Sequence, residues 1–225
     1  MTYDFKEYAD REMLAIDLAS QIAGELRAAL SHQDRAALAV PGGTSPGPVF
    51  DALCAADLDW SRVDVLLTDE RWVPESSDRS NTRLLRERLL TDRASAARLL
   101  PLYAEAETPE DKLAELADAI APSLPLAVVL LGMGADMHTA SIFPEADKLE
   151  EALSPDAPIL LPMRAPGAPE PRITLSASAL DGAMKKHILI YGREKREVLA
   201  KAKGLPAIEA PINAILDEAT VHWAE

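Results

Sequence analysis

Residues 126–132, LAVVLLG, form an apolar run that ends abruptly in the glycine-rich polar segment GMGADMH, residues 132–138. An unbroken run of valine and leucine is typical of a strand that is buried on both faces of a sheet. In open α/β sheets, ligands bind outside the carboxyl ends of such strands. The pattern therefore places His138 where chemistry is usually done, and the ordinary histidine pKa of about 6.5 suits a base near neutrality.

Other apolar runs share this pattern and alternate with segments of helical periodicity. We expect strands at residues 36–40, 63–69, 126–132, 172–176, 187–192 and, as a last edge strand, 220–223; we expect helices at 10–30, 48–56, 81–90, 109–121 and 193–204. The proline-rich residues 155–171 are predicted to form a loop over the edge of the sheet. This alternation predicts a single three-layer Rossmann-like α/β domain over residues 1–225, with a mostly parallel sheet and helices on both faces.

The composition narrows the classes of partner. The chain has 225 residues, 48% of them hydrophobic, and a formal charge of −14 with the acidic residues scattered along it. Such a surface repels nucleic acid and anionic membranes, so neither is an expected partner. If the substrate is an anion, a few arginine or lysine side chains must reverse the field locally.

The cysteine content and the N-terminal residues indicate the cellular compartment in which the protein is expected. Cys54 is the only cysteine, which excludes an intramolecular disulfide and favours a reducing environment. The N-terminal residues are polar and acidic, unlike a signal peptide, and the longest apolar run is far shorter than the ~20 residues that span a bilayer. We expect a cytoplasmic protein, either a monomer or a homodimer.

The first loop with chemical potential is GGTSPG, residues 42–47, which follows a predicted strand. Gly42 and Gly43 allow the backbone to approach an anion, and Thr44 adds a hydroxyl group. The alternative is an ordinary strand-to-helix turn, because the glycine spacing matches neither the P-loop nor the dinucleotide fingerprint.

Charged residues follow the other predicted strands. Asp69 and Arg71 lie at a strand end, and the planar fork of an arginine suits phosphate or carboxylate. Arg172 precedes a β-branched run, and Lys195 lies in the first turn of a helix, where a cation opposes the helix dipole. A helix cap or salt bridge is the alternative for the first pair, and a solvated surface position is the alternative for Arg172 and Lys195.

His138 and Asp136 form the sharpest candidate pair. A carboxylate can orient an imidazole and stabilise its protonated form, although a lone histidine is often only structural. Two side chains do not complete a metal ligand set, and no GxSxG serine motif is present. We therefore expect activation of water, without a metal or another cofactor, rather than covalent catalysis.

Taken together, these segments resemble the 6-phosphogluconolactonase family in order and spacing over nearly the whole chain. The matching segments are PGGTSP (41–46), TDERWVP (68–74), SN (80–81), LLGMGADMHTASIFP (130–144), PRITLS (171–176) and GREK (192–195). The resemblance implies a fold shared with glucosamine-6-phosphate isomerases. It also implies hydrolysis of a small sugar phosphate lactone, 6-phospho-D-glucono-1,5-lactone, to 6-phosphogluconate in the oxidative pentose phosphate pathway.

The family's roles are carried over only to matching positions. The resemblance implies that His138 is the general base and that Asp136 supports it. It implies that the phosphate is bound by Gly42, Gly43, Thr44, Arg172 and Lys195. It further implies that Asp69 and Arg71 line the sugar site.

One position departs from the family pattern. Met137 stands between the aspartate and the histidine, where the family usually has glycine. If this position has a positive φ, a methionine there costs about 1 kcal/mol.

Two rival functions remain. Glucosamine-6-phosphate isomerases/deaminases have similar glycine loops, but they place a proton-transferring glutamate before the proline that follows the histidine. In this chain Phe143 holds that position and cannot move a proton. The second rival is a sugar-phosphate-sensing module, for which no DNA-binding helix-turn-helix segment is left over.

Overall fold

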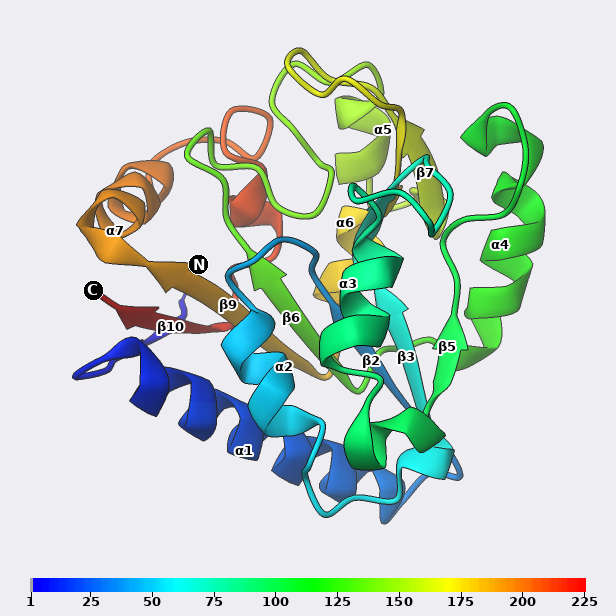
Figure 1. Ribbon diagram of the computed structural model, residues 1–225. Helices are drawn as coiled ribbons and strands as arrows, with labels where there is room; N and C mark the ends of the chain where they lie inside the picture. Colours follow the sequence, from blue (N-terminus) through cyan, green and yellow to red (C-terminus); the bar gives the residue numbers. More distant parts are fainter. Residues whose placement is uncertain (1) are drawn as a thin grey trace.

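The computed structural model describes residues 2–225. Its main sheet has seven strands, all parallel, in the order β1-β10-β9-β6-β2-β3-β5 (Figure 1). Their bounds are β1 Asp4–Glu7, β2 Ala36–Val40, β3 Val63–Leu67, β5 Arg98–Leu100, β6 Val128–Gly132, β9 Lys185–Tyr191 and β10 Thr220–Ala224. Every residue of β2 and β3 is buried, so both faces of the sheet are covered there, and the predicted α/β fold with a mostly parallel sheet is confirmed.

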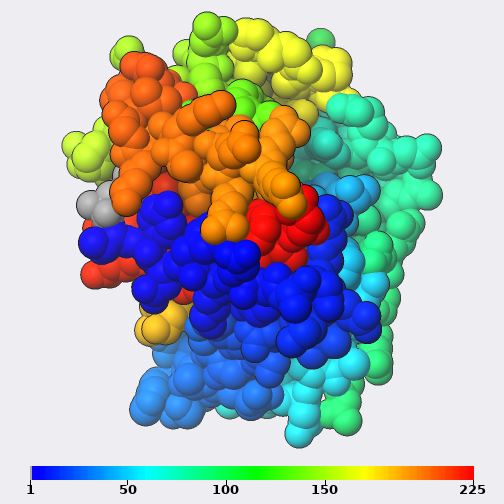
Figure 2. Space-filling view, turned by 90° about the vertical axis from the view of Figure 1, so that its left-hand side faces the viewer, coloured from blue at the N-terminus to red at the C-terminus, as the bar shows by residue number. Residues whose placement is uncertain are grey.

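Seven α-helices accompany the sheet within the described residues. They are α1 Arg11–Leu30, α2 Gly47–Leu53, α3 Asn81–Arg88, α4 Leu113–Ile120, α5 Leu149–Leu153, α6 Ala177–Asp181 and α7 Gly192–Ala202. The side chain of Asp10 caps α1 by accepting a hydrogen bond from the backbone N–H of Met13 at 2.8 Å. The buried residues of α1 recur at helical spacing, as its sequence predicts. Figure 2 shows α1 and the N-terminal strand below α7, with the C-terminal residues between them.

A second, smaller sheet is antiparallel and corrects one prediction. It has the order β4-β8-β7, with β4 Asp69–Arg71, β7 Leu160–Met163 and β8 Arg172–Leu175. The prediction that residues 172–176 belong to the parallel sheet is therefore wrong, and the expected loop at 155–171 contains β7. A short apolar run has the same pattern in either sheet, and only its long-range partner decides between them.

The edges of the main sheet differ from expectation as well. The strand expected at residues 220–223 exists as β10, but it lies between β1 and β9 and is not an edge strand. The edge strand is β1, whose sequence DFKE is exposed throughout. A short polar strand has no apolar periodicity, which is why the sequence alone did not predict it.

The strand order places a crevice near the middle of the sheet. From β2 the chain continues outward through β3 and β5, whereas from β6 it continues to the other side through β9 and β10. The connections that leave the carboxyl ends of β2 and β6 therefore run in opposite directions. This is the topological switch point at which open α/β sheets bind their ligands.

Candidate active site

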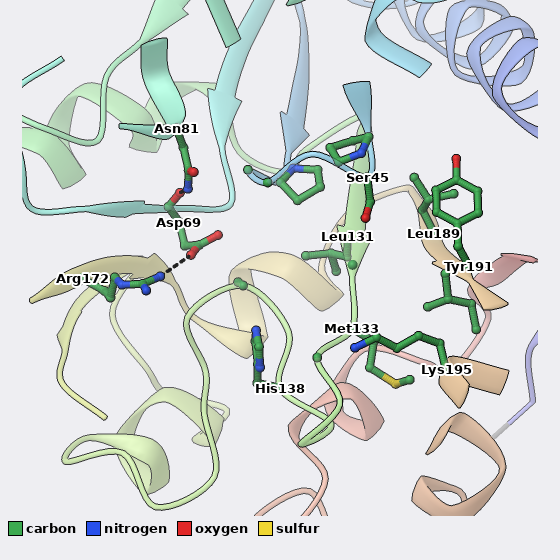
Figure 3. A pocket seen from close by; sticks show the side chains of 18 of the residues that line it. Ser45, Asp69, Asn81, Leu131, Met133, His138, Arg172, Leu189, Tyr191 and Lys195 are labelled. Atoms are coloured by element: carbon green, nitrogen blue, oxygen red, sulfur yellow. Dashed lines mark hydrogen bonds and ion pairs between the residues drawn. The ribbon is translucent and has the colours of Figure 1, made fainter. Parts of the chain in front are cut away.

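A cavity of about 290 Å³ opens at this switch point (Figure 3). Seven of the nine site residues predicted from the sequence line it: Gly42, Gly43, Asp69, Arg71, His138, Arg172 and Lys195. Thr44 is exposed and does not line the cavity, whereas its neighbour Ser45 does. Asp136 does not line the cavity, but its carboxylate contacts the His138 ring.

His138 is held by a tight turn at the end of β6. Its Nδ1 lies 2.5 Å from Oδ1 of Asp136, and its backbone N–H donates to the same oxygen at 3.2 Å. The hydrogen bond to His138 holds the pKa of Asp136 below its usual range, against the opposing effect of burial. Because Nδ1 is engaged, Nε2 is the ring nitrogen left for proton transfer.

Glycine is required at position 134 by this pair. A Cβ atom at Gly134 would collide with the His138 ring and with Oδ1 of Asp136. The N–H of Gly134 donates to the carbonyl of His138 at 2.9 Å, which closes the turn. Gly134 thus has a steric role beside the candidate base, whereas a Cβ atom at Gly132 would meet nothing within 4 Å.

Met137 has a φ of 66°, in the left-handed region that glycine adopts without strain. Its N–H donates to the carbonyl of Gly134 at 3.1 Å, and its carbonyl accepts from Ile212 at 3.1 Å. Its half-buried side chain packs against the core. The condition under which a methionine is costly here, a positive φ, is thus met, and Met137 adopts it within the same turn that carries His138.

Two arginines face the cavity from the small sheet. Arg71 and Arg172 are paired residues across β4 and β8. The Nε atom of each is buried and has no hydrogen-bond partner among the described residues. Burial lowers the pKa of Arg172, although the nearby Asp69 carboxylate opposes that effect. Two guanidinium groups with unsatisfied buried donors form a site that suits an anion.

Asp69 is buried, and both oxygens of its carboxylate accept hydrogen bonds. Its Oδ1 accepts from Thr68 at 3.1 Å, and its Oδ2 accepts from the Ser141 hydroxyl at 2.5 Å. Nη1 of Arg172 lies 3.9 Å from Oδ2, beyond a direct hydrogen bond (Figure 3). Ser141, three residues after His138, was not singled out from the sequence. Its hydroxyl ties the loop of the candidate base to β4.

Asn81 is a cavity residue whose place sequence reasoning missed. It begins α3, and the pattern around it predicted only a helix cap. Its Oδ1 accepts from Arg71 at 2.9 Å, and its Nδ2 donates to the carbonyl of Asp69 at 3.2 Å. Its carboxamide occupies the space that a Cβ at Gly42 would need. The resemblance in the segment SN was the one signal available for it.

The loop after β2 presents free backbone donors. Within the described residues, the N–H groups of Gly42, Gly43 and Thr44 donate no hydrogen bond. Gly43 has a φ of 81°, a conformation that glycine adopts without strain. Free amides beside a cavity are suited to bind an anion.

Lys195 lies across the cavity from the arginines. Figure 3 shows His138 between Arg172 on one side and Lys195 on the other. Lys195 is half-buried in the first turn of α7 and has no ion-pair partner in the described part of the chain. The positive side chains thus surround the candidate base and oppose the negative charge of the whole molecule.

Phe143, the residue that the resemblance sets against a deaminase function, contacts the candidate base. The ring of Phe143 lies 4.4 Å from the His138 ring, centroid to centroid, at an interplanar angle of 39°. The guanidinium of Arg172 lies 5.6 Å from the centroid of the same ring. An apolar ring therefore stands beside His138, at the position to which the resemblance assigns the glutamate of a deaminase.

Comparison with known proteins decides the family. Residues 9–223 match the family model for glucosamine-6-phosphate isomerases/6-phosphogluconolactonase. The chain belongs to this family. A 6-phosphogluconolactonase of Rhizobium meliloti is 44% identical, with 100% of both chains covered.

Solved structures agree with this assignment. A 6-phosphogluconolactonase from Shewanella baltica has a TM-score of 0.96 at 36% identity, covering 100% of this chain and 98% of that one. A monomeric glucosamine-6-phosphate deaminase has a TM-score of 0.78 at 15% identity, covering 99% and 97%. The expectation of a fold shared with that second group is confirmed, and so is the expectation of an enzyme of the 6-phosphogluconolactonase type.

Among residues 2–225, no helix combines the length and apolar character that crossing a membrane requires. In the same residues, histidine, cysteine, aspartate and glutamate side chains nowhere gather in a group of three or more that suits a metal ion.

Proposed function

We propose that the protein hydrolyses 6-phospho-D-glucono-1,5-lactone to 6-phospho-D-gluconate, with His138 activating the attacking water. The proposal places this reaction in the cytoplasm, as a step of the oxidative pentose phosphate pathway, in one domain over residues 1–225. The observation that carries it is the His138–Asp136 pair in a cavity whose wall holds unsatisfied arginine donors.

The phosphate of the substrate is assigned to the positive wall of the cavity. The free amides of Gly42, Gly43 and Thr44 supply hydrogen bonds, and Arg172 and Lys195 supply charge. Charge-assisted hydrogen bonds of this kind are about twice as strong as neutral ones. Anchoring the phosphate brings the lactone carbonyl toward His138. Because the reacting groups are then held in position, less entropy is lost in reaching the transition state.

The chemical step needs one base. Nε2 of His138 takes a proton from water while the water oxygen forms a bond to the lactone carbonyl carbon. Asp136 stabilises the resulting imidazolium through Nδ1. The carbonyl oxygen becomes an oxyanion, for which a backbone N–H of one of the glycine loops is the candidate donor.

Collapse of the intermediate completes the reaction. The carbonyl double bond forms again, the bond between the carbonyl carbon and the ring oxygen breaks, and the imidazolium returns its proton to that oxygen. The product is the open-chain acid, which ionises at neutral pH. A lactone is an activated ester, so one base and good anchoring suffice.

The test compares hydrolysis of freshly generated 6-phosphogluconolactone by the wild type, by His138→Ala and by buffer alone. We expect a wild-type rate well above the spontaneous one and a loss of about 10²–10⁴-fold in kcat for His138→Ala. His32→Ala is the matched control, because His32 is exposed and lies outside the cavity. A His138→Ala variant with the wild-type rate would falsify the assignment of the base.

The same experiment separates the rival functions. Glucosamine 6-phosphate offered as substrate should release no ammonia, because Phe143 supplies no carboxylate beside His138. A protein that binds 6-phosphogluconate yet leaves the lactone at its spontaneous rate is a sensor, and this outcome would overturn the proposal.

A further inference from the structure

Glu70 lies between two residues that line the cavity but does not line it itself. Successive side chains of a strand point to opposite faces, so Asp69 and Arg71 share the cavity side of β4 while Glu70 points away. Its side chain is fully buried, with a relative exposure of 0%. A buried carboxylate is costly unless its oxygens accept hydrogen bonds.

The carboxylate of Glu70 accepts five hydrogen bonds. Oε1 accepts from the backbone N–H groups of Arg71 and Asn81, both at 2.8 Å. Oε2 accepts from the backbone and hydroxyl of Thr82, at 2.7 and 2.8 Å, and from the Ser80 hydroxyl at 3.2 Å. Each of the five contacts uses a donor on the partner, so both oxygens act only as acceptors, as an ionised carboxylate does.

These hydrogen bonds fasten the start of α3 onto β4. The helix start carries Asn81, whose carboxamide reaches three parts of the cavity wall. It accepts from the guanidinium of Arg71, donates to the carbonyl of Asp69 and fills the space beside Gly42. A shift of the helix start therefore moves the wall and the loop with the free amides together.

We infer that Glu70 is a positioning residue for substrate binding, which acts through Asn81 on Arg71 and on the loop at Gly42. The inference rests on the proposed function, because the bound anion it concerns is the phosphorylated substrate. Glu70 touches neither His138 nor Asp136, which belong to the separate loop after β6. Its removal should therefore weaken binding more than it slows the chemical step.

The first test is Glu70→Gln. A glutamine has one oxygen and one NH₂ group, so either the two donors at the Oε1 position or the three at the Oε2 position meet a donor instead of an acceptor. We expect KM for the lactone to rise by about 10-fold or more while kcat stays within about threefold. Binding of 6-phosphogluconate, measured by calorimetry, should weaken by a similar factor.

Asp64→Asn is the matched control. Asp64 is also a buried strand carboxylate, and it accepts from Arg35, Arg98 and Ser123. It lies near the amino end of β3, whereas the cavity is at the carboxyl ends. We expect this variant to lose stability and to keep the wild-type KM.

A second pair of variants covers the case in which Glu70→Gln does not fold. Thr82→Val removes one of the five donors and nearly preserves shape, and we expect KM to rise by about threefold. Asn81→Ala should raise KM by about 10-fold, and adding Thr82→Val to it should raise KM no further.

The outcomes separate this inference from the proposed function. A wild-type protein without lactonase activity contradicts the proposed function, and the calorimetric comparison still tests Glu70. An active wild type with unchanged KM and product affinity in Glu70→Gln, or in Thr82→Val if the former does not fold, overturns the inference. Additive effects of the Asn81 and Thr82 substitutions overturn it as well, because Glu70 would then not act through Asn81.

Discussion

Arg71 and Arg172 lie directly opposite each other in the antiparallel pair of β4 and β8, and the Nε atom of each is buried without an acceptor. Like charges at directly opposed positions destabilise a sheet. The nearest carboxylate, that of Asp69, stays 3.9 Å from Arg172 and is already engaged by Thr68 and Ser141. We therefore expect the pair to carry an electrostatic cost that a bound anion would relieve.

Arg172→Met should separate binding from stability. Removing a poorly compensated buried charge should raise the free energy of unfolding by about 1 kcal/mol. Loss of a charge-assisted contact to the phosphate should raise KM by about 10- to 100-fold. Thermal unfolding and lactone kinetics check both effects, with Arg164→Met as control, because Arg164 is paired with Glu110 outside the cavity. A less stable variant with wild-type KM would contradict the prediction.

Asp136→Asn should lower the rate more than the affinity. The Asp136 carboxylate orients Nδ1 of His138 and stabilises the imidazolium, but about half of its side chain is exposed, so solvent screens part of the effect. We expect kcat to fall by about 10- to 100-fold while KM changes by less than about threefold. Asp147→Asn, in the same loop but outside the cavity lining, should keep the wild-type kcat. Equal kcat values for the two variants would show that His138 works without its carboxylate.

The parts of the fold that could be predicted from the sequence are those whose pattern is local. The apolar runs of β2, β3 and β6 correctly predict buried strands. All residues of β2 and β3 are buried, and so are all residues of β6 except its last, Gly132. The strand β8 has the same kind of pattern, yet it belongs to the small antiparallel sheet. The strand with which a given strand pairs depends on residues far away in the chain, and the local hydrophobic periodicity does not indicate it.

The same distinction holds for the site. His138, Asp136 and the glycines could be located because they follow strand ends in one short segment each. Asn81 and Ser141 could not be predicted from the sequence, because their roles come from contacts between distant segments. Asn81 contacts β4, and Ser141 contacts Asp69. Each has an ordinary local appearance, the first as the start of a helix and the second as a loop serine.

Met137 offers a direct measure of backbone strain beside the base. Because its φ is 66°, the glycine variant should relieve strain but lose the half-buried side chain. Comparing Met137→Gly with Met137→Ala removes the side-chain contribution from the difference. We expect the glycine variant to be more stable than the alanine variant by about 1 kcal/mol, measured by denaturant unfolding. Equal stabilities would show that the loop relaxes away from positive φ once the methionine is gone.

A chain of polar side chains outside the cavity lining connects β9 and β10 to α1, and it is buried at His187 and His222. His187 is 2.7 Å from Glu25 and 3.0 Å from His222, whose other ring nitrogen is 2.9 Å from the Tyr8 hydroxyl; that hydroxyl donates to Asp17 at 2.7 Å. Because the Tyr8 hydroxyl donates to Asp17, its oxygen accepts from Nδ1 of His222, and Nε2 of His222 then accepts from Nδ1 of His187. His222 therefore needs only one ring proton in this chain of contacts, as a neutral imidazole has.

The neutrality of His222 predicts how stability depends on pH. Burial, with smaller effects of His187 and Lys6, lowers the pKa of His222 to about 3. Below the unfolded-state pKa of about 6.5, the unfolded chain binds a proton that the folded chain does not, so stability falls as the pH falls toward 3. This group should remove about 2 kcal/mol between pH 7.5 and pH 5. Urea unfolding across this range should show that loss in the wild type and in the exposed-site control His32→Gln, and a shallower slope in His222→Gln; identical slopes in all three proteins would contradict the prediction.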